Sequence, residues 1–165
     1  MNWDQYFISM AYLVAMKSKD RSTKIGSVIV GPDHEIRSTG YNGMPRGVDD
    51  NVDSRHERPL KYALTEHGER NAIFNAARMG ISVMGCTMYT QDFPCVDCAR
   101  AIIQSGIKKL VYHAAFAAEN KLRPQWEESW NNAETLLRES GIEVVVYDGP
   151  VTALTGFRSG KVMVL

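Results

Sequence analysis

Two short segments constrain this chain more than any other feature, because together they carry three candidate metal ligands. Residues 67–69 read His-Gly-Glu, and residues 94–98 read Pro-Cys-Val-Asp-Cys. A structural zinc ion is usually closed by four protein ligands, whereas a hydrolytic zinc ion has three and keeps a fourth position for water. His67, Cys95 and Cys98 supply three ligands, so the pattern H-x-E…P-C-x-x-C indicates a catalytic zinc centre.

Glu69 is the candidate proton carrier of this centre. Bound zinc lowers the pKa of a coordinated water from about 15.7 toward about 7, which supplies a nucleophile at neutral pH. General acid and base catalysis adds typically about 10²–10⁴ in rate. If His67 opens a helix, Glu69 lies roughly 200° round it, at 3.6 residues per turn. We therefore expect its carboxylate to reach the water and the substrate from the side rather than to bind the metal.

Composition favours one domain and a small substrate. The chain has 165 residues, which we expect to form a single domain over 1–165. Lys plus Arg and Asp plus Glu each total 19, so no overall basic field is present to attract a polynucleotide. Cys86 is the one cysteine outside the C-x-x-C motif, which fits a reducing cytoplasm better than a disulfide framework. No apolar run approaches membrane-spanning length, and we expect a cytoplasmic protein.

Apolar periodicity predicts a layered α/β fold. The segment 42–66 is polar and aperiodic and is expected to be a long functional loop. Pro94 is expected in the first turn of a helix, which would place Cys95 and Cys98 at i and i+3 on one face. The alternation after residue 66 predicts parallel crossovers. The expected helices cover 3–17, 69–79, 94–105 and 125–140, and the expected strands cover 25–30, 35–41, 86–90, 107–113 and 142–147.

Further segments carry a resemblance to a known family. They are Trp3–Phe7, Ser18–Asp20, Gly40–Pro45, Glu69–Ile73 and Gln104–Lys108. With them, the chain resembles the cytidine and deoxycytidylate deaminase family over residues 3–147, and within it the deoxycytidine monophosphate (dCMP) deaminases. The stretch Gly-Tyr-Asn-Gly-Met-Pro is the most discriminating, because the zinc segments are shared by the whole superfamily.

The resemblance implies a fold and a reaction. The fold would be a cytidine deaminase-like three-layer α/β/α arrangement with a five-stranded mixed sheet. The reaction would be the zinc-dependent hydrolysis of dCMP to dUMP and ammonia, with one catalytic Zn²⁺ per chain, to supply thymidylate synthesis. Glu69 would take the proton from water, donate it to N3, and then protonate the leaving amine. The chain would be a homo-oligomer, a hexamer or a dimer, with dCTP and dTTP as allosteric effectors.

The resemblance also implies substrate contacts. Asn42 would contact the sugar, and the backbone near Gly26, Ser27 and Gly68 would read the pyrimidine edge. For the phosphate, charge and position in the loop before the first strand suggest Ser22 and Lys24, together with Lys19; Arg46 is a further candidate.

Two features depart from the family pattern. The family commonly has alanine between the zinc histidine and the glutamate, whereas this chain has Gly68, which removes a methyl group beside the expected pocket. The segment 114–130, with Arg123, Trp126 and Trp130, is longer than expected and is a candidate lid, base-selecting element or subunit contact.

Alternatives remain open at this level. Cys86 could join the three ligands in a closed, non-catalytic Cys₃His zinc site. A deaminase of a free cytosine-type base or nucleoside would share every zinc residue, and a tRNA-adenosine-type deaminase would need a basic face and show steep salt dependence. The side chain of Asn42 could serve only the Asn-Gly turn. Trp126 and Trp130 favour a core or interface position over a base-stacking platform.

Overall fold

A five-stranded mixed sheet forms the centre of the computed structural model, which describes residues 1–119, 123–152, 155–158 and 161–164. The strand order is β2-β1-β3-β4-β5. Strand β1 pairs antiparallel with β2 and with β3, whereas β3 with β4 and β4 with β5 are parallel. The predicted α/β fold with a mixed sheet is confirmed. The strands are β1 (Gly26–Val30), β2 (Ile36–Tyr41), β3 (Thr87–Thr90), β4 (Lys109–His113) and β5 (Glu143–Tyr147).

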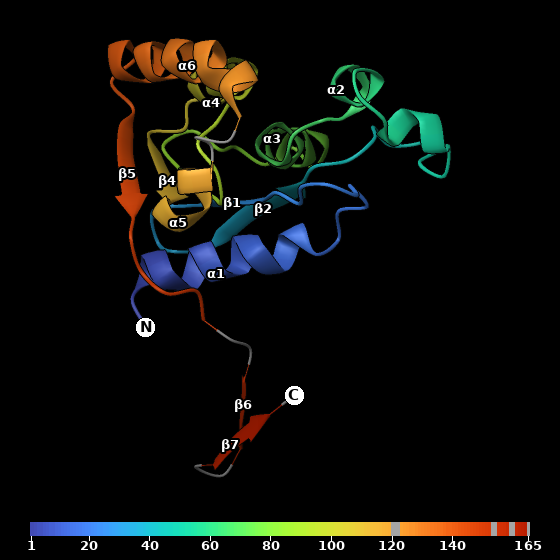
Figure 1. Cartoon of the computed structure of the whole chain (residues 1–165). Helices are drawn as coiled ribbons and strands as arrows, with labels where there is room; N and C mark the ends of the chain where they lie inside the picture. Colours follow the sequence, from blue (N-terminus) through green and yellow to red (C-terminus); the bar gives the residue numbers. More distant parts are fainter. Residues whose placement is uncertain (120–122, 153–154, 159–160, 165) are drawn as a thin grey trace.

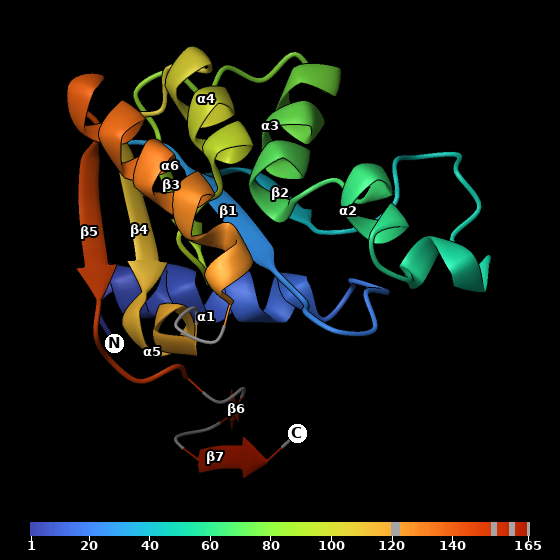
Figure 2. The ribbon, with the colours of Figure 1, turned by 45° about the horizontal axis from the view of Figure 1, so that its top comes forward.

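Helices cover both faces of this sheet. Helix α1 (Trp3–Ala15) lies on one face, and α3 (Gly68–Arg78), α4 (Val96–Gln104) and α6 (Glu127–Glu139) lie on the other, as Figures 1 and 2 show from two directions. The short helix α5 (Ala114–Ala117) follows β4 directly. The predicted three-layer arrangement is therefore present.

The buried apolar side chains form two clusters, and strand β1 contributes to both. All five of its residues are buried, and side chains along a strand point alternately to opposite faces. Val28 and Val30 join Phe7 and Ile8 of α1 in one cluster, whereas Ile29 belongs to the cluster under α3, α4 and α6. A strand covered on both faces favours a continuous apolar run, which Val28, Ile29 and Val30 supply.

The segment 42–66 is not the continuous loop that its sequence predicts. It contains a 3₁₀ helix, η1 (Asp53–His56), and the short helix α2 (Leu60–Leu64), shown beside α3 in Figure 2. Helices of four and five residues are too short to produce a recognisable apolar period. A further 3₁₀ helix, η3 (Pro124–Trp126), precedes α6, and β6 (Thr155–Arg158) pairs antiparallel with β7 (Lys161–Val164). Across the described ranges, no helix is long and apolar enough to span a bilayer.

The prediction that Pro94 occupies the first turn of a helix was wrong. Helix α4 begins at Val96, and Cys95 is its N-cap, with an extended backbone at φ −70° and ψ 170°. Pro94 therefore precedes the helix. Cys95 and Cys98 still lie within one turn of each other, at the N-cap and the third helical position.

Two glycines let the helices lie unusually close to the sheet. A Cβ atom at Gly26 would lie 2.1 Å from the carbonyl oxygen of Ala11 in α1. A Cβ atom at Gly40 would lie 2.2 Å from the backbone nitrogen of Ala72 in α3. Both contacts are with backbone atoms, which cannot turn aside as a flexible side chain can. Any side chain at either position would push a helix away from its strand.

We predict that Gly40→Ala destabilises the protein, because the added methyl group overlaps the backbone of α3. The expected loss is about 1–3 kcal/mol or more in the free energy of unfolding, measured by urea denaturation. Gly43→Ala is the matched control, since a Cβ atom at Gly43 meets nothing within 4 Å. Equal stabilities of the two variants would contradict the close approach of α3 and β2.

Candidate metal centre and active site

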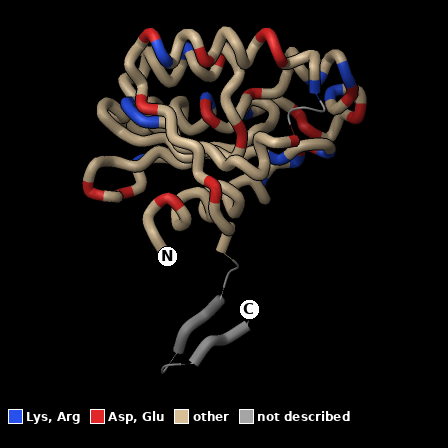
Figure 3. The backbone as a smooth tube through the Cα atoms, turned by 60° about the vertical axis from the view of Figure 1, so that its left-hand side comes forward, with Lys and Arg blue, Asp and Glu red and all other residues tan. Residues whose placement is uncertain are grey.

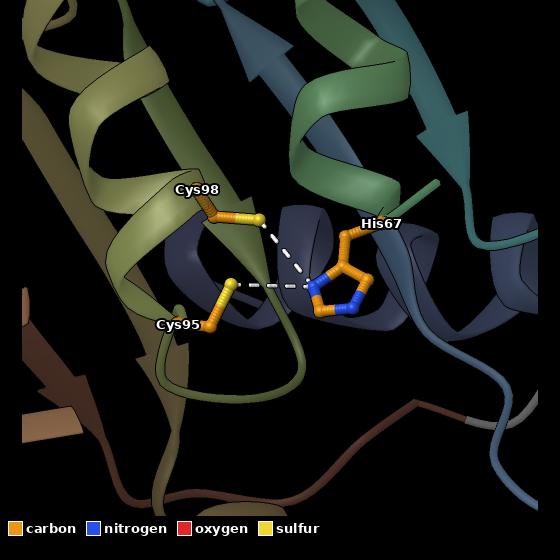
Figure 4. A group of neighbouring side chains, drawn as sticks. All are labelled: His67, Cys95 and Cys98. Atoms are coloured by element: carbon orange, nitrogen blue, oxygen red, sulfur yellow. Dashed lines mark hydrogen bonds between the residues drawn. The ribbon is translucent and has the colours of Figure 1, made fainter. Parts of the chain in front are cut away.

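His67, Cys95 and Cys98 converge at one point between α3 and α4 (Figure 4). The Nδ1 atom of His67 lies 3.5 Å from the Sγ atom of Cys95 and 3.5 Å from the Sγ atom of Cys98. All three ligand atoms lie within 4.8 Å of one another, and no other such group occurs in the part of the chain that the structure describes. The sequence prediction that these residues come together is therefore met by the geometry.

This donor set fits a zinc ion. With Zn–N near 2.0–2.1 Å and Zn–S near 2.3 Å, a tetrahedral site separates nitrogen from sulfur by roughly 3.5 Å. The two observed separations agree with that estimate. Thiolate and imidazole groups also suit zinc, whereas magnesium and calcium prefer oxygen ligands. Cys86 does not complete a closed site, because it is buried in the apolar cluster with Met88 and Leu110.

The site exists because two helices begin at the same place. His67 is the N-cap of α3, and Cys95 is the N-cap of α4. The amino terminus of a helix carries partial positive charge, which stabilises anions such as thiolates. Arg70 of α3 forms an ion pair with Glu66 at 2.7 Å and reaches Asp97 of α4 at 4.0 Å, so it links the two helix starts.

The pKa values of the three candidate ligands show how strongly they interact with one another. A hydrogen bond with Cys98 lowers the pKa of Cys95 to about 4, although burial opposes the shift. The same hydrogen bond, together with burial, raises the pKa of Cys98 well above its usual range. Burial alone would lower the pKa of His67, but its hydrogen bond to Cys95 and the charge of Glu69 raise that pKa to about 9. A metal ion that replaces these protons would bind all three ligands.

Glu69 follows the candidate metal ligand His67 by two residues and is almost fully buried, at 4% exposed. Burial is the main cause that raises its pKa to about 7, while the positive charge of His67 acts in the opposite direction. Its side chain lines the same cavity as His67 and Cys95. The carboxyl group therefore faces the space where a metal-bound water and a substrate would meet.

The cavity at this site has a volume of about 400 Å³, within the range typical of small-molecule sites. Three aromatic rings form a row along one wall. The rings of His67 and Trp126 are 6.1 Å apart, those of Trp126 and Tyr62 are 5.5 Å apart, and the Arg58 guanidinium lies 5.7 Å from the Tyr62 ring centre. The described residues that line it are Asp20, Thr23, Ile25, Asn42, Arg58, Lys61, Tyr62, Thr65, His67, Glu69, Asp92, Phe93, Cys95, Arg123, Gln125, Trp126 and Trp130.

Asn42 lines the cavity, as expected of a residue that contacts substrate. Its Oδ1 atom accepts from the backbone N–H of Ile25 at 2.8 Å. Its Nδ2 atom donates to the carbonyl oxygen of Thr23 at 2.8 Å and to Asp20 at 3.2 Å. The side chain thus holds the loop before β1 rather than the Asn-Gly turn. A sugar contact by Asn42 stays a prediction.

Five residues predicted to contact the substrate are not part of the described cavity lining. Gly26 donates its N–H to Gln91 at 2.6 Å, and the hydroxyl of Ser27 donates to Thr90 at 3.1 Å. Their role, like that of the remaining three, stays a prediction. The five are Ser22, Lys24, Gly26, Ser27 and Gly68.

The other phosphate candidates already have partners on the protein. Lys19 forms an ion pair with Asp50 at 2.8 Å, and Arg46 donates to Asn75. Lys24 is exposed. The loop before β1 therefore contributes no lysine to the cavity lining in the described structure.

The absence of a side chain at Gly68 affects how α3 packs against the start of β1. A Cβ atom there would lie 3.0 Å from the carbonyl oxygen of Ile25 and 3.4 Å from the hydroxyl of Ser27. Alanine would fit only if β1 or α3 moved by a few tenths of an ångström. Glycine at position 68 is therefore suited to the close approach of α3 to Ile25 and Ser27.

Sequence reasoning missed the basic side of the cavity. Arg58, Lys61 and Arg123 all line it, and only Arg123 was noted, as part of the long segment 114–130. Trp126 and Trp130 were expected in the core or an interface, but both line the cavity. The unusual length of 114–130 was the signal available, since long connections in compact domains often carry function.

The sequence is similar to a known family and to several known proteins. Residues 1–114 match the family described as the cytidine and deoxycytidylate deaminase zinc-binding region. The chain is 39% identical over 117 residues to human deoxycytidylate deaminase, a match that takes in 68% of this chain and 65% of the relative, so it spans less than two thirds of that protein. It is also 39% identical over 142 residues to an uncharacterized deaminase of the luxG 3′ region of Aliivibrio fischeri, covering 86% of this chain and 91% of the relative.

The fold is likewise shared with a solved structure. The dCMP deaminase of the cyanophage S-TIM5, in complex with dCMP and dUMP, matches with a TM-score of 0.67 at 23% sequence identity, over 87% of this chain and 95% of that one. The three-layer arrangement is therefore that of the cytidine deaminase fold.

We predict that the protein binds one zinc ion, or one cobalt ion in its place, through His67, Cys95 and Cys98. Thiolate-to-cobalt charge transfer in the near-ultraviolet should appear on Co²⁺ addition and be lost in Cys98→Ser. Cys86→Ser is the matched control and should keep the band, because Cys86 lies in the apolar core. Loss of the band in the Cys86 variant, or its persistence in the Cys98 variant, would contradict the ligand set.

We also predict that a buried ion pair makes stability depend on pH. Nζ of Lys61 lies 2.8 Å from Oδ1 of Asp20, and the two side chains are 10% and 4% exposed. Burial opposes the shift, but hydrogen bonds from Lys61 and from the N–H groups of Thr23 and Ser22 lower the pKa of Asp20 below its usual value. The pair therefore stabilises the fold above pH about 4, and this contribution is lost as the pH falls through the folded-state pKa.

Lys61→Met tests this ion pair, because it leaves the carboxylate of Asp20 buried without its cation. Urea denaturation at pH 7 should show a loss of about 3–5 kcal/mol relative to wild type. The difference should be smaller when the measurement is repeated at pH 3, since the contribution of the pair falls as Asp20 takes up a proton. A difference that is the same at both pH values would refute the electrostatic explanation.

Proposed function

Because the chain belongs to the cytidine and deoxycytidylate deaminase family, we propose that it is a zinc-dependent hydrolase that converts dCMP and water to dUMP and ammonia. Its curated relatives include deoxycytidylate deaminases, and a similar fold has been solved with dCMP and dUMP bound. The product would supply the precursor of thymidylate.

One observation carries this proposal. The metal ligands His67 and Cys95 and the buried carboxyl group of Glu69 line one cavity of about 400 Å³. A closed structural zinc site would have four protein ligands and no reason to face a cavity. Three ligands beside a buried acid are what a hydrolytic centre requires.

Glu69 would carry the protons of the reaction. When bound, one zinc ion per chain would lower the pKa of a water molecule and so supply the nucleophile. The water oxygen adds to C4 of the pyrimidine, and the bond between C4 and the amino nitrogen breaks. Glu69 takes one proton from the water and delivers it to N3. It then transfers the second proton to the leaving amine, which departs as ammonia.

Asn42 and the start of β1 would orient the substrate. Oδ1 of Asn42 accepts one N–H, from Ile25, and keeps a second lone pair that can accept a hydrogen bond from a sugar hydroxyl. The backbone near Gly26, Ser27 and Gly68 is proposed to lie at the pyrimidine edge. Support for this comes from their sequence neighbours, because Ile25, His67 and Glu69 line the cavity.

Assembly and location complete the proposal. We propose a single domain in a cytoplasmic homo-oligomer, a hexamer or a dimer, that responds to dCTP and dTTP. These points rest on the family resemblance. The three reduced cysteines are consistent with a reducing compartment.

We predict that Glu69→Gln abolishes turnover of dCMP but keeps zinc and fold, because the amide has the same shape and cannot carry the proton. Ammonia release should fall by about 10²–10⁴ or more. Glu134→Gln, an exposed change on α6, is the matched control and should keep full activity. Zinc content and the melting temperature of both variants should match wild type.

A substrate panel would complete this experiment. Ammonia release should be greatest from dCMP, and lower from CMP, deoxycytidine and cytosine. Undiminished turnover by Glu69→Gln would refute the role of Glu69. Release from deoxycytidine or cytosine in preference to dCMP would refute the nucleotide assignment and leave the zinc chemistry in place.

A further inference from the structure

Three cationic side chains of the cavity have no part in the proposed chemistry. Lys61 lies in the first turn of α2, and Arg58 lies two residues before this helix. Arg123 lies in the connection between β4 and α6. We propose that Arg58, Lys61 and Arg123 form the subsite for the 5′-phosphate of the substrate. This inference rests on the proposed function, and it replaces Ser22 and Lys24 as the phosphate-binding residues.

The two arginines keep their full positive charge for a ligand. Nε of Arg58 donates to the hydroxyl of Tyr62 at 2.7 Å, and Arg123 donates to the hydroxyl of Thr23 at 3.3 Å. Both partners are neutral, and neither arginine forms an ion pair within the described ranges of the chain. A guanidinium group held by one neutral contact retains further N–H groups in a fork that matches a phosphate.

Lys61 adds a fixed donor to the same wall. It is 8% exposed, and its ammonium group donates to Asp20 at 2.8 Å and also to the hydroxyl of Ser22. An ammonium group has three donors, so one remains for a ligand in the cavity. Asp20 cancels one positive charge of the three, and the two arginines supply the excess.

The positions of these groups match a nucleotide that has a neutral base and an anionic tail. The row of rings from His67 through Trp126 to Tyr62 connects the metal ligands to Arg58. The buried carboxyl group of Glu69 lies at the metal end of the cavity, two residues from His67, whereas the carboxyl group of Asp20 is paired with Lys61. The base would therefore face the zinc ligands, and the phosphate would face the arginines.

The basic wall of the cavity, formed by Arg58, Lys61 and Arg123, is a local feature rather than part of a general basic surface. The chain has 19 basic and 19 acidic residues, and Figure 3 shows the two kinds interspersed along the backbone. Long-range attraction of a polyanion is therefore weak, and a single phosphate group held by short contacts is favoured over a nucleic acid.

Steady-state kinetics on dCMP and deoxycytidine would test the subsite, since the two substrates differ only by the phosphate. The variants are Arg58→Gln and Arg123→Gln, with Arg138→Gln on the exposed side of α6 as the matched control. In each cavity variant, the ratio of kcat/KM for dCMP to that for deoxycytidine should fall about 10- to 100-fold. The control ratio should equal that of wild type.

Binding of dUMP, deoxyuridine and inorganic phosphate, measured by calorimetry on the zinc-loaded protein, provides a readout that needs no turnover. The arginine variants should weaken dUMP and phosphate binding and leave deoxyuridine binding as in wild type. Failure of the proposed function would appear separately, as wild-type protein that releases no ammonia from either substrate.

Two outcomes would overturn the subsite. Equal losses on dCMP and deoxycytidine would show that the arginines act on the cavity as a whole and not on the phosphate. An unchanged ratio in both arginine variants, with a fall in Lys24→Gln instead, would return the phosphate to the loop before β1.

Discussion

The meeting of two helix amino termini is the arrangement on which the rest of the site depends. His67 and Cys95 are the N-caps of α3 and α4, so the candidate metal ligands lie where both helix starts carry positive partial charge. Arg70 joins the two helix starts through Glu66 and Asp97. The close approach of α3 to β2 at Gly40 fixes α3, and hence His67 and Glu69, against the sheet.

The central sheet, the long helices and the candidate zinc ligands could be predicted from the sequence, because each is marked by a pattern of residues close together in the chain. The strands and long helices follow from apolar period, and the ligand spacing of His67, Cys95 and Cys98 is specific by itself. Helix α2 was missed, since five residues show no period. The start of α4 was placed too early, because proline is as compatible with the extended residue before an N-cap as with the first turn.

The basic wall of the cavity could not be predicted, because it depends on contacts between distant parts of the chain. Arg58 and Arg123 are 65 residues apart in sequence, and both lie in segments without regular period. Charge near β1 favoured Lys24, but Lys24 is exposed and the cavity faces α2 and the segment before α6. The packing of Tyr62 against Trp126 brings those two segments to the same cavity.

A crystal structure of the zinc-loaded Glu69→Gln protein with dCMP would show directly whether this cavity binds the nucleotide with its base at the metal. We expect one zinc ion on Nδ1 of His67 and the two thiolates, with the amino-bearing carbon of the base toward the metal and the phosphate between Arg58 and Arg123. A fourth protein ligand on zinc, or a nucleotide bound outside this cavity, would contradict it.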